Sequence, residues 1–93
     1  MKTFIRVYWH HDFEDEPVIL VSEIVDRVET RKVEVYRNGR MDYSDGSLAT
    51  GTTRLSEVLM PSVAEIADHP EFSPEVIDAK GFEDIWNQAL QQK

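Results

Sequence analysis

Residues 33–43 alternate apolar and polar side chains on both sides of an Asn-Gly dipeptide. This combination is typical of a β-hairpin, because Asn and Gly both accept the positive φ angles of tight turns. A shift of one residue in the pairing moves every side chain to the other face, so the loop length decides which face is apolar. A three-residue loop ending at Gly39 pairs Val35 with Met41, whereas a two-residue loop pairs Val35 with an acid. We therefore predict the three-residue loop, with Gly39 in the left-handed conformation and a strand over residues 40–44.

Three earlier segments also follow the period-two pattern of half-buried strands. They span residues 3–11, 18–25 and 28–37, and a two-residue turn at 26–27 joins the second segment to the third. The acidic residues 12–16 form the loop between the first two segments. Strands joined by such short connections pair antiparallel, so the chain predicts an antiparallel meander.

Strand parity predicts which side chains face the core. With a regular two-residue turn, Leu20 lies opposite Val33. Arg31 then shares the face of Val33 and Val35, which we take as the covered face. The other face would carry an apolar patch, and we expect that patch to mark an interface unless residues 45–75 fold over it. The patch consists of Phe4, Arg6, Tyr8, Ile19, Val21 and Tyr36.

The C-terminal segment has the clearest helical pattern. A single apolar stripe repeats at helical spacing through Phe82, Ile85, Trp86, Ala89 and Leu90. Asp78 is placed to cap the first turn of this helix. A sheet with one apolar face needs a cover, and we expect this helix to supply it, with Trp86 as the main anchor.

The region between the fourth strand and this helix is less regular. Residues 45–53 are small and polar and predict a loop, and residues 54–59 predict a short edge strand. A Ser-x-x-Glu capping box begins a short helix over 62–68, and 73–75 begin a further turn, helical or not. The predicted fold is a single α+β domain over residues 1–93. It is a four- to five-stranded antiparallel meander sheet, covered on one face by the C-terminal helix and the short preceding helix.

Composition narrows the possible functions. The chain of 93 residues has no cysteine and a formal net charge of −8. This charge argues against nucleic acid as a partner, because binding nucleic acid relies on neutralising phosphates. Arg6 interrupts any apolar signal-peptide region, and the longest apolar run, Val18–Val21, is too short to cross a membrane. We therefore expect a cytoplasmic protein without a membrane partner.

The motifs of common chemistry are incomplete in this chain. His10 and His11 should point to opposite faces of a strand, and residues 12–16 lack the spacing of a calcium-binding loop. Residues 46–53 have the two glycines of a phosphate-binding loop without its lysine. No Gly-x-Ser-x-Gly segment supplies a nucleophilic serine. We predict no catalytic residue, no metal site and no cofactor.

Arg31 is the charged residue that the pattern places on the core face, where it needs a partner. Ser22 and Glu29 are the nearest candidates by register, and an acidic residue of a helix is another. One interpretation of Arg31 is a structural ion pair at the end of the core. The other is a site at which Arg31 binds an anion.

Nearly the whole chain resembles a family of small bacterial proteins known as domain of unknown function six-eight-eight-one. The resemblance lies in the segments Tyr8–His11, Leu20–Ile24, Glu29–Tyr36, Leu55–Val58, Glu65–Ile66, Glu71–Phe72 and Phe82–Trp86, with Pro17, Gly39 and Pro61. Two positions depart from it: Val21 stands where the family often has tyrosine, and Gly81 replaces an acidic residue. The family brings no established activity, so the resemblance implies a compact domain that often stands alone and assigns no functional residue.

We expect a non-enzymatic protein-interaction domain, such as an acidic inhibitor or immunity-type protein for a basic partner. The residues expected to bind that partner are Arg6, Tyr8, Asp12, Glu14, Asp15 and Glu16. The alternative is a small anion- or ligand-binding domain, or an enzyme, that uses the cleft between sheet and helices, with Arg31 holding an anion. The chain is expected to be a monomer or a homodimer, the latter through edge pairing of the first strand.

Overall fold

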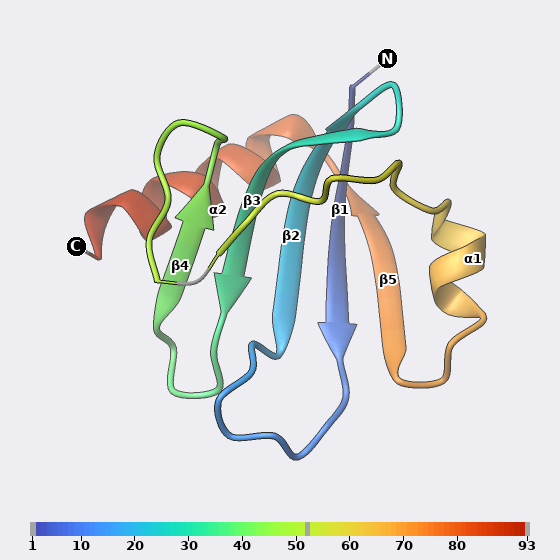
Figure 1. The fold of residues 1–93 in the computed structure, drawn as a ribbon, viewed down its shortest axis with the longest axis horizontal. Coiled ribbons are helices and arrows are strands. Elements are labelled where there is room, and N and C mark those ends of the chain that lie inside the picture. The colour runs from blue at the N-terminus through green and yellow to red at the C-terminus, as the bar shows by residue number, and fades with distance from the viewer. Residues whose placement is uncertain (1, 52, 93) are drawn as a thin grey trace.

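A computed structural model describes residues 2–51 and 53–92. Within these residues the elements are β1 (Lys2–Trp9), β2 (Ile19–Val25), β3 (Val28–Val35), β4 (Met41–Ser44), α1 (Val63–Ala67), β5 (Phe72–Ile77) and α2 (Ala79–Gln91). The strands form an antiparallel sheet in the order β4-β3-β2-β1-β5 (Figure 1). The first four strands form the predicted meander, and β5 returns to lie beside β1. The prediction of an α+β fold with an antiparallel sheet is confirmed.

Both predicted hairpin turns are present. Asp26 and Arg27 have φ angles of 50° and 70°, as the two-residue turn between β2 and β3 requires. At the second turn Val35 pairs with Met41, and Gly39 has a φ angle of 93°. The three-residue loop and the left-handed glycine are therefore confirmed.

The pairing of β2 with β3 contains a β-bulge that strand parity did not predict. Next to the turn Ile24 pairs with Glu29, but the preceding residue of β2, Glu23, pairs with Arg31. Thr30 is the extra residue, and its hydroxyl donates to a carboxylate oxygen of Glu23 over 2.8 Å. From the bulge onwards the register is shifted by one residue, which exchanges the two faces of β2 relative to β3.

The bulge corrects the predicted assignment of faces. Val33 lies opposite Val21, whereas pairing without a bulge would place it opposite Leu20. Phe4 and Val21, expected on an exposed apolar patch, are buried with Val33 against α2, and Tyr36 is buried as well. The expected patch is therefore wrong, because Phe4 and Val21 belong to the core and Ile19 packs against it.

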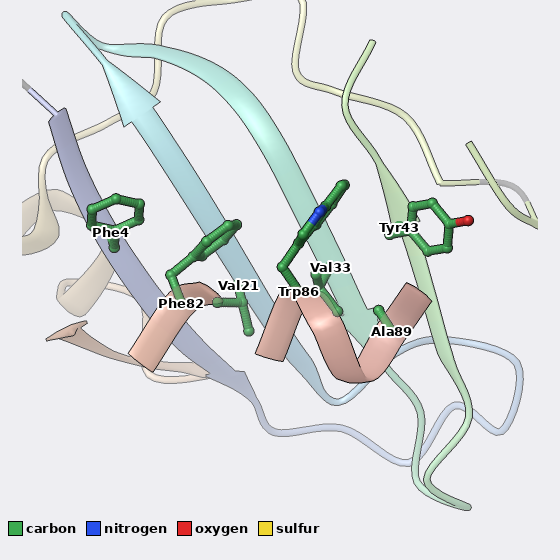
Figure 2. Close-up of a cluster of buried hydrophobic side chains, with 7 residues drawn as sticks. All are labelled: Phe4, Val21, Val33, Tyr43, Phe82, Trp86 and Ala89. Atoms are coloured by element: carbon green, nitrogen blue, oxygen red, sulfur yellow. The ribbon is translucent and has the colours of Figure 1, made fainter. Parts of the chain in front are cut away.

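The face of the sheet covered by α2 is filled with aromatic and branched side chains (Figure 2). The ring centroid of Phe82 lies 5.2 Å from that of Phe4 and 6.3 Å from that of Trp86. Tyr43 meets Trp86 edge to face at 5.3 Å. Trp86 is buried over Val33, so the predicted anchoring role of Trp86 and the inward direction of Val33 are confirmed.

The opposite face is covered by α1 and by an irregular segment that we call the strap, residues 53–62 (Figure 1). The apolar cluster on this face consists of Ile5, Val7, Ile24 and Ile66, with Leu20, Met60, Val63 and Phe72 packed against it. The two helices therefore lie on opposite faces of the sheet instead of sharing one. The strap contains no strand, so the edge strand predicted over 54–59 is wrong.

The fifth strand of the sheet is β5, whereas the sequence predicted a turn at 73–75. Pro74 lies inside this strand, and proline fits a strand at the edge of a sheet because it has no N–H to donate. The pairing of β5 with β1 also occupies the outer side of β1. A homodimer formed by edge pairing of β1 is therefore not compatible with this fold.

Both predicted helix caps are confirmed. Ser62 and Glu65 form the capping box of α1, with hydrogen bonds of 3.1 and 2.9 Å between side chain and backbone. A carboxylate oxygen of Asp78 accepts from the Gly81 N–H at the start of α2 over 2.7 Å. Among the described residues, no helix has the length and apolar character needed to cross a membrane.

Candidate binding surfaces

The loop between β1 and β2, residues 10–17, carries a dense group of acidic side chains, and we call it the acidic loop. Its base is closed by a hydrogen bond of 2.9 Å from the Trp9 N–H to the Val18 carbonyl. The carboxylates of Asp12, Glu14, Asp15 and Glu16 all lie on exposed residues. Within the described part of the chain none of them takes part in an ion pair. The loop therefore presents concentrated negative charge to solvent.

Arg37, in the β3–β4 loop, holds the acidic loop in position. Its guanidinium donates to the His11 carbonyl over 2.6 Å and to the Phe13 carbonyl over 3.4 Å. The His11 ring bridges the loop internally: Nδ1 accepts from the Phe13 N–H at 2.9 Å, and Nε2 lies 2.8 Å from the Pro17 carbonyl. Because Nδ1 accepts, the proton must sit on Nε2, which donates to that carbonyl. These contacts fix the backbone that carries the acids.

An aromatic ladder runs from the acidic loop to β5. His11 lies with its ring centroid 5.2 Å from Phe13 and 4.3 Å from Trp9. The ring centroid of Trp9 lies 6.2 Å from that of Phe72, and the centroid of Phe72 lies 6.0 Å from that of His69. Phe13, at the end of the ladder, is 61% exposed in the midst of the acidic side chains. An exposed ring on a supported loop beside carboxylates combines apolar and charged contact groups in one surface.

Two of the residues expected to bind a partner, Arg6 and Tyr8, lie on the other face of β1 from Trp9. Arg6 donates to the Glu75 carboxylate over 2.9 Å, and this hydrogen bond raises the pKa of Arg6. The guanidinium also lies 5.7 Å from the centroid of the Tyr8 ring. The structure thus brings the four acids of the predicted set together and leaves Arg6 and Tyr8 apart from the aromatic ladder.

Arg31 lies between two carboxylates at the α2 face. It donates to Glu23 of the paired strand β2 over 2.6 and 3.0 Å, and to Glu83 of α2 over 3.1 Å. A second nitrogen of Arg31 also contacts the Glu83 carboxylate. Its guanidinium also lies over the rings of Phe82 and Trp86, at 4.7 and 5.1 Å. These are the contacts expected of the structural ion pair, with one of the helix acids as a partner.

The charges around Arg31 are mutually stabilised. Hydrogen bonds from Arg31, and secondarily from Thr30, lower the pKa of Glu23 to about 2. Arg31 likewise lowers the pKa of Glu83 and has its own pKa raised by both carboxylates. An external anion would have to displace a carboxylate from this arrangement. Ser22 and Glu29, the partners suggested by regular pairing, lie on the opposite face because of the bulge.

A cavity of about 380 Å³ lies on the strap face of the sheet. Its apolar walls come from β1, β2, β5, the strap and α1, through Ile5, Val7, Leu20, Phe72, Met60, Pro61 and Ile66. At one corner the walls are polar, with Ser22, Glu29, Lys32 and Ser56. Glu65 and His69, both exposed, stand at its rim.

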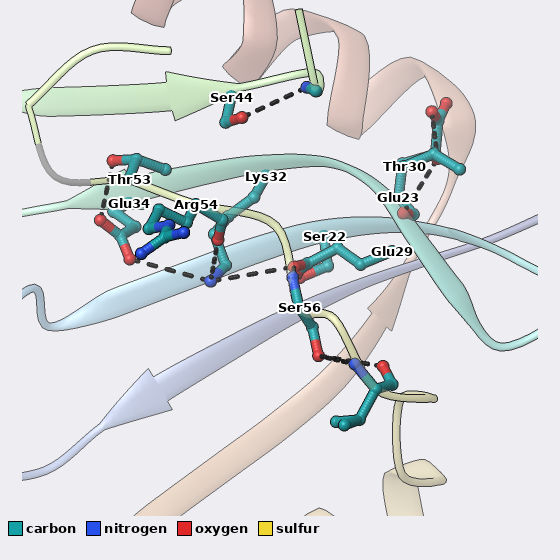
Figure 3. A network of polar contacts seen from close by, with 12 residues as sticks. Ser22, Glu23, Glu29, Thr30, Lys32, Glu34, Ser44, Thr53, Arg54 and Ser56 are labelled. Carbon is teal, nitrogen blue, oxygen red and sulfur yellow. Dashed lines mark hydrogen bonds and ion pairs between the residues drawn. The ribbon is translucent and has the colours of Figure 1, made fainter.

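The polar corner is part of a network that ties the strap to the sheet (Figure 3). Glu29 is buried and accepts from the Ser22 hydroxyl and from the Ser56 N–H, each over 2.7 Å. Lys32 donates to the Arg54 carbonyl over 3.1 Å. Its Nζ lies 3.8 Å from Glu29 and 3.9 Å from Glu34. Side chains of the sheet thus bond to the backbone of the strap at Arg54 and Ser56.

The aromatic ladder was not part of the predicted site. The alternative prediction was a cleft between sheet and helices, but it was placed beside Arg31 and named none of the residues that line the cavity. The alternation of Trp9, His11 and Phe13 was a usable signal, because period two places them on one side of an extended chain. Phe72 could join them only through the pairing of β5 with β1. Among the described residues no group of His, Asp or Glu side chains is arranged to hold a metal ion, and His10 instead bonds to the Ser73 hydroxyl at 2.7 Å.

Comparison with protein families shows where the chain belongs. It is a member of the family described as Domain of unknown function (DUF6881), which matches residues 3–91. The resemblance noted from the sequence is thus confirmed over nearly the whole chain. Comparison with curated proteins and with solved structures gives no match.

Proposed function

We propose that the chain is a protein-interaction domain and that the acidic loop, with Phe13 at its tip, binds a basic surface of another protein. The observation that carries the proposal is the combination of four exposed carboxylates lacking ion pairs in the described chain with a ring that is 61% exposed. Carboxylates of this kind speed the encounter with a basic partner, and a central aromatic side chain supplies the apolar anchor.

The internal support of the acidic loop favours binding as well. Arg37 and His11 hold the backbone at residues 11, 13 and 17, so little conformational freedom is lost when a partner binds. Backbone order that is already present in the free protein increases affinity without any additional contact. An inhibitor or immunity-type protein acting on a basic target would need such a surface, and we propose this role for the domain.

The alternative, binding of an anion in a cleft beside Arg31, has less support in the geometry. Arg31 already bonds to Glu23 and Glu83, and the space between the sheet and α2 is filled by the buried cluster around Phe82. An anion at this position would also approach two carboxylates, which repel it. The acidic loop is therefore the better candidate surface.

The experiment compares capture of binding proteins from the source cells by three immobilised proteins. The first is the wild type. The second has its loop charges removed by Asp12→Asn, Glu14→Gln, Asp15→Asn and Glu16→Gln. The third has the same change in net charge at exposed positions elsewhere, by Glu57→Gln, Asp68→Asn, Glu71→Gln and Asp84→Asn.

The proposal expects a basic protein that binds the wild type and the third protein but not the second, and that elutes as salt is raised. Phe13→Ala should weaken the same interaction at all salt concentrations, because it removes an apolar contact. Equal binding to the second and third proteins would show that only net charge matters and would contradict the proposed surface. Absence of any captured protein at low salt would contradict the proposed function itself.

A further inference from the structure

We propose a second binding site, the cavity on the strap face, and infer that it takes a small, uncharged, mostly apolar molecule with a hydrogen-bond acceptor. This site is separate from the charged surface of the acidic loop and does not depend on the function proposed for that loop. A volume of about 380 Å³ is within the range of small-molecule sites in proteins. The cavity is bounded by three different parts of the fold: the sheet, the strap and α1.

The walls select an apolar molecule. Ile5, Val7 and Leu20 of the sheet face Met60 and Ile66 across the cavity. Transfer of an apolar ring from water into such a site is favourable in proportion to the area that it buries. A strongly hydrated molecule would lose its water without replacement over most of this surface.

The polar corner selects an acceptor. Lys32 has three N–H donors and, among the residues that the structure describes, makes one hydrogen bond, of 3.1 Å, to the Arg54 carbonyl. Its nearest carboxylate oxygens, on Glu29 and Glu34, lie 3.8 and 3.9 Å away, beyond normal hydrogen-bond length. Donor capacity therefore remains on Lys32 where it lines the cavity, and a carbonyl oxygen of a bound molecule can accept from it.

The charge of the corner selects an uncharged molecule. Glu29 and Glu34 outweigh the single positive charge of Lys32, so a carboxylate in the cavity would face net negative charge. A cation is attracted by that net charge but brings no acceptor for Lys32, and the Glu29 carboxylate that would hold it is only 1% exposed and is occupied by Ser22 and Ser56. An uncharged acceptor avoids both penalties.

The test uses three soluble probes that share a phenyl ring: acetophenone, benzoate and benzylammonium. Each is titrated into the full chain, and the backbone amide resonances of Ser56 and Ile66 are followed by NMR. We expect acetophenone to shift these resonances with a dissociation constant at least roughly tenfold lower than that of either charged probe. Stronger binding of benzoate or benzylammonium would overturn the inferred ligand class, and absence of shifts with all three would overturn the site.

Two variants test the roles of the donor and of the space. Lys32→Met keeps an apolar stem but removes the donor, so acetophenone should bind roughly tenfold more weakly, whereas Lys80→Met on the exposed side of α2 should change nothing. Leu20→Phe fills the cavity and should abolish the shifts. If Lys32→Met does not fold, the decision rests on Leu20→Phe and on the ranking of the three probes. Unchanged binding by a folded Lys32→Met or Leu20→Phe protein would contradict the proposal.

Discussion

The two faces of the sheet are stabilised in different ways. On the α2 face, rings from the helix and the strands pack together, and Arg31 covers Phe82 and Trp86 while it bonds to two acids. On the strap face, the cover is an irregular segment joined to the sheet by individual hydrogen bonds from side chains and by one backbone bond from Met60 to Arg27, and a cavity remains beneath it. One face is therefore densely packed, and the other combines a smaller apolar cluster with polar contacts.

This difference separates the parts of the molecule that provide stability from those available for binding. A densely packed core cannot relax fully around a side chain of different volume, so substitutions on the α2 face should destabilise the whole domain. Polar contacts to a strap should instead control a local opening, because the strap can detach while the sheet and α2 remain folded.

The largest effect is expected for Trp86→Ala. Removal of this buried ring leaves a cavity between α2 and the sheet, and the free energy of unfolding should fall by about 3–5 kcal/mol, close to the total of a small domain. Urea denaturation followed by circular dichroism measures this change. Leu59→Ala in the strap, at a side chain that is 56% exposed, is the control and should change stability by less than about 0.5 kcal/mol. Equal losses in the two variants would contradict the distinction between the faces.

The second effect is loss of stability in acid through Glu23. Because Arg31 lowers the folded-state pKa of Glu23 to about 2, its contribution is complete above the unfolded-state value of 4.5. This contribution, about 3 kcal/mol, should be lost as the pH falls from roughly 5 to 2. Denaturant unfolding at several pH values measures the slope. In Glu23→Gln the stability at neutral pH should be lower and the slope shallower, and an unchanged slope would show that another group titrates.

The third effect concerns the strap and should be local. Glu29→Ala removes the acceptor of the half-buried Ser56 N–H and an acid near Lys32, at a cost of about 1–3 kcal/mol. Hydrogen exchange at the Ser56 amide should accelerate more than exchange in α2, because the strap opens before the domain unfolds. Glu57→Ala, at an exposed residue of the same strap, is the matched control. Equal acceleration at Ser56 and in α2 would indicate that strap and sheet unfold together.

The sequence predicted the features that depend on residues close together in the chain. The Asn-Gly hairpin, the Ser62 and Asp78 caps and the stripe around Trp86 each follow from local geometry, and each is confirmed. The bulge at Thr30 was not predictable in this way, because residues 29–32 are all polar and offer no alternation that an extra residue would interrupt. Only the pairing with Glu23 reveals the extra residue. That single residue reversed the assignment of Phe4 and Val21 from surface to core.

The candidate site shows the same division between local and long-range information. The sequence shows the negative charge of the acidic loop, and it shows aromatic rings at every second position from Trp9 to Phe13. The strand β5 was missed because Pro74 favours a turn locally, although the edge beside β1 accommodates it. With β5 unknown, neither Phe72 in the ladder nor the wall of the cavity could be placed. The contact of Arg37 with the loop likewise joins segments that only the folded sheet brings together.

The smallest effect on global stability, and the one most informative about function, is expected for Arg37→Ala. The exposed hydrogen bonds from Arg37 to the His11 and Phe13 carbonyls contribute less than about 1 kcal/mol to the free energy of unfolding. Their loss should nevertheless make the acidic loop more mobile, since Arg37 is its link to the β3–β4 hairpin. Backbone order parameters from NMR relaxation should fall for residues 12–16 and stay unchanged in β1.

Arg40→Ala provides the control for this last prediction, because Arg40 lies in the same hairpin and contacts Tyr36 and Asp42 instead of the loop. If the loop binds a partner as a preformed surface, Arg37→Ala should weaken that binding although every acid and Phe13 are retained, whereas Arg40→Ala should not. A loop that remains ordered without Arg37 would show that the bonds of His10 to Glu71 and Ser73, and those of the His11 ring to the Phe13 N–H and the Pro17 carbonyl, are sufficient to order it. The comparison therefore measures the support that the β3–β4 hairpin gives to the acidic loop through Arg37.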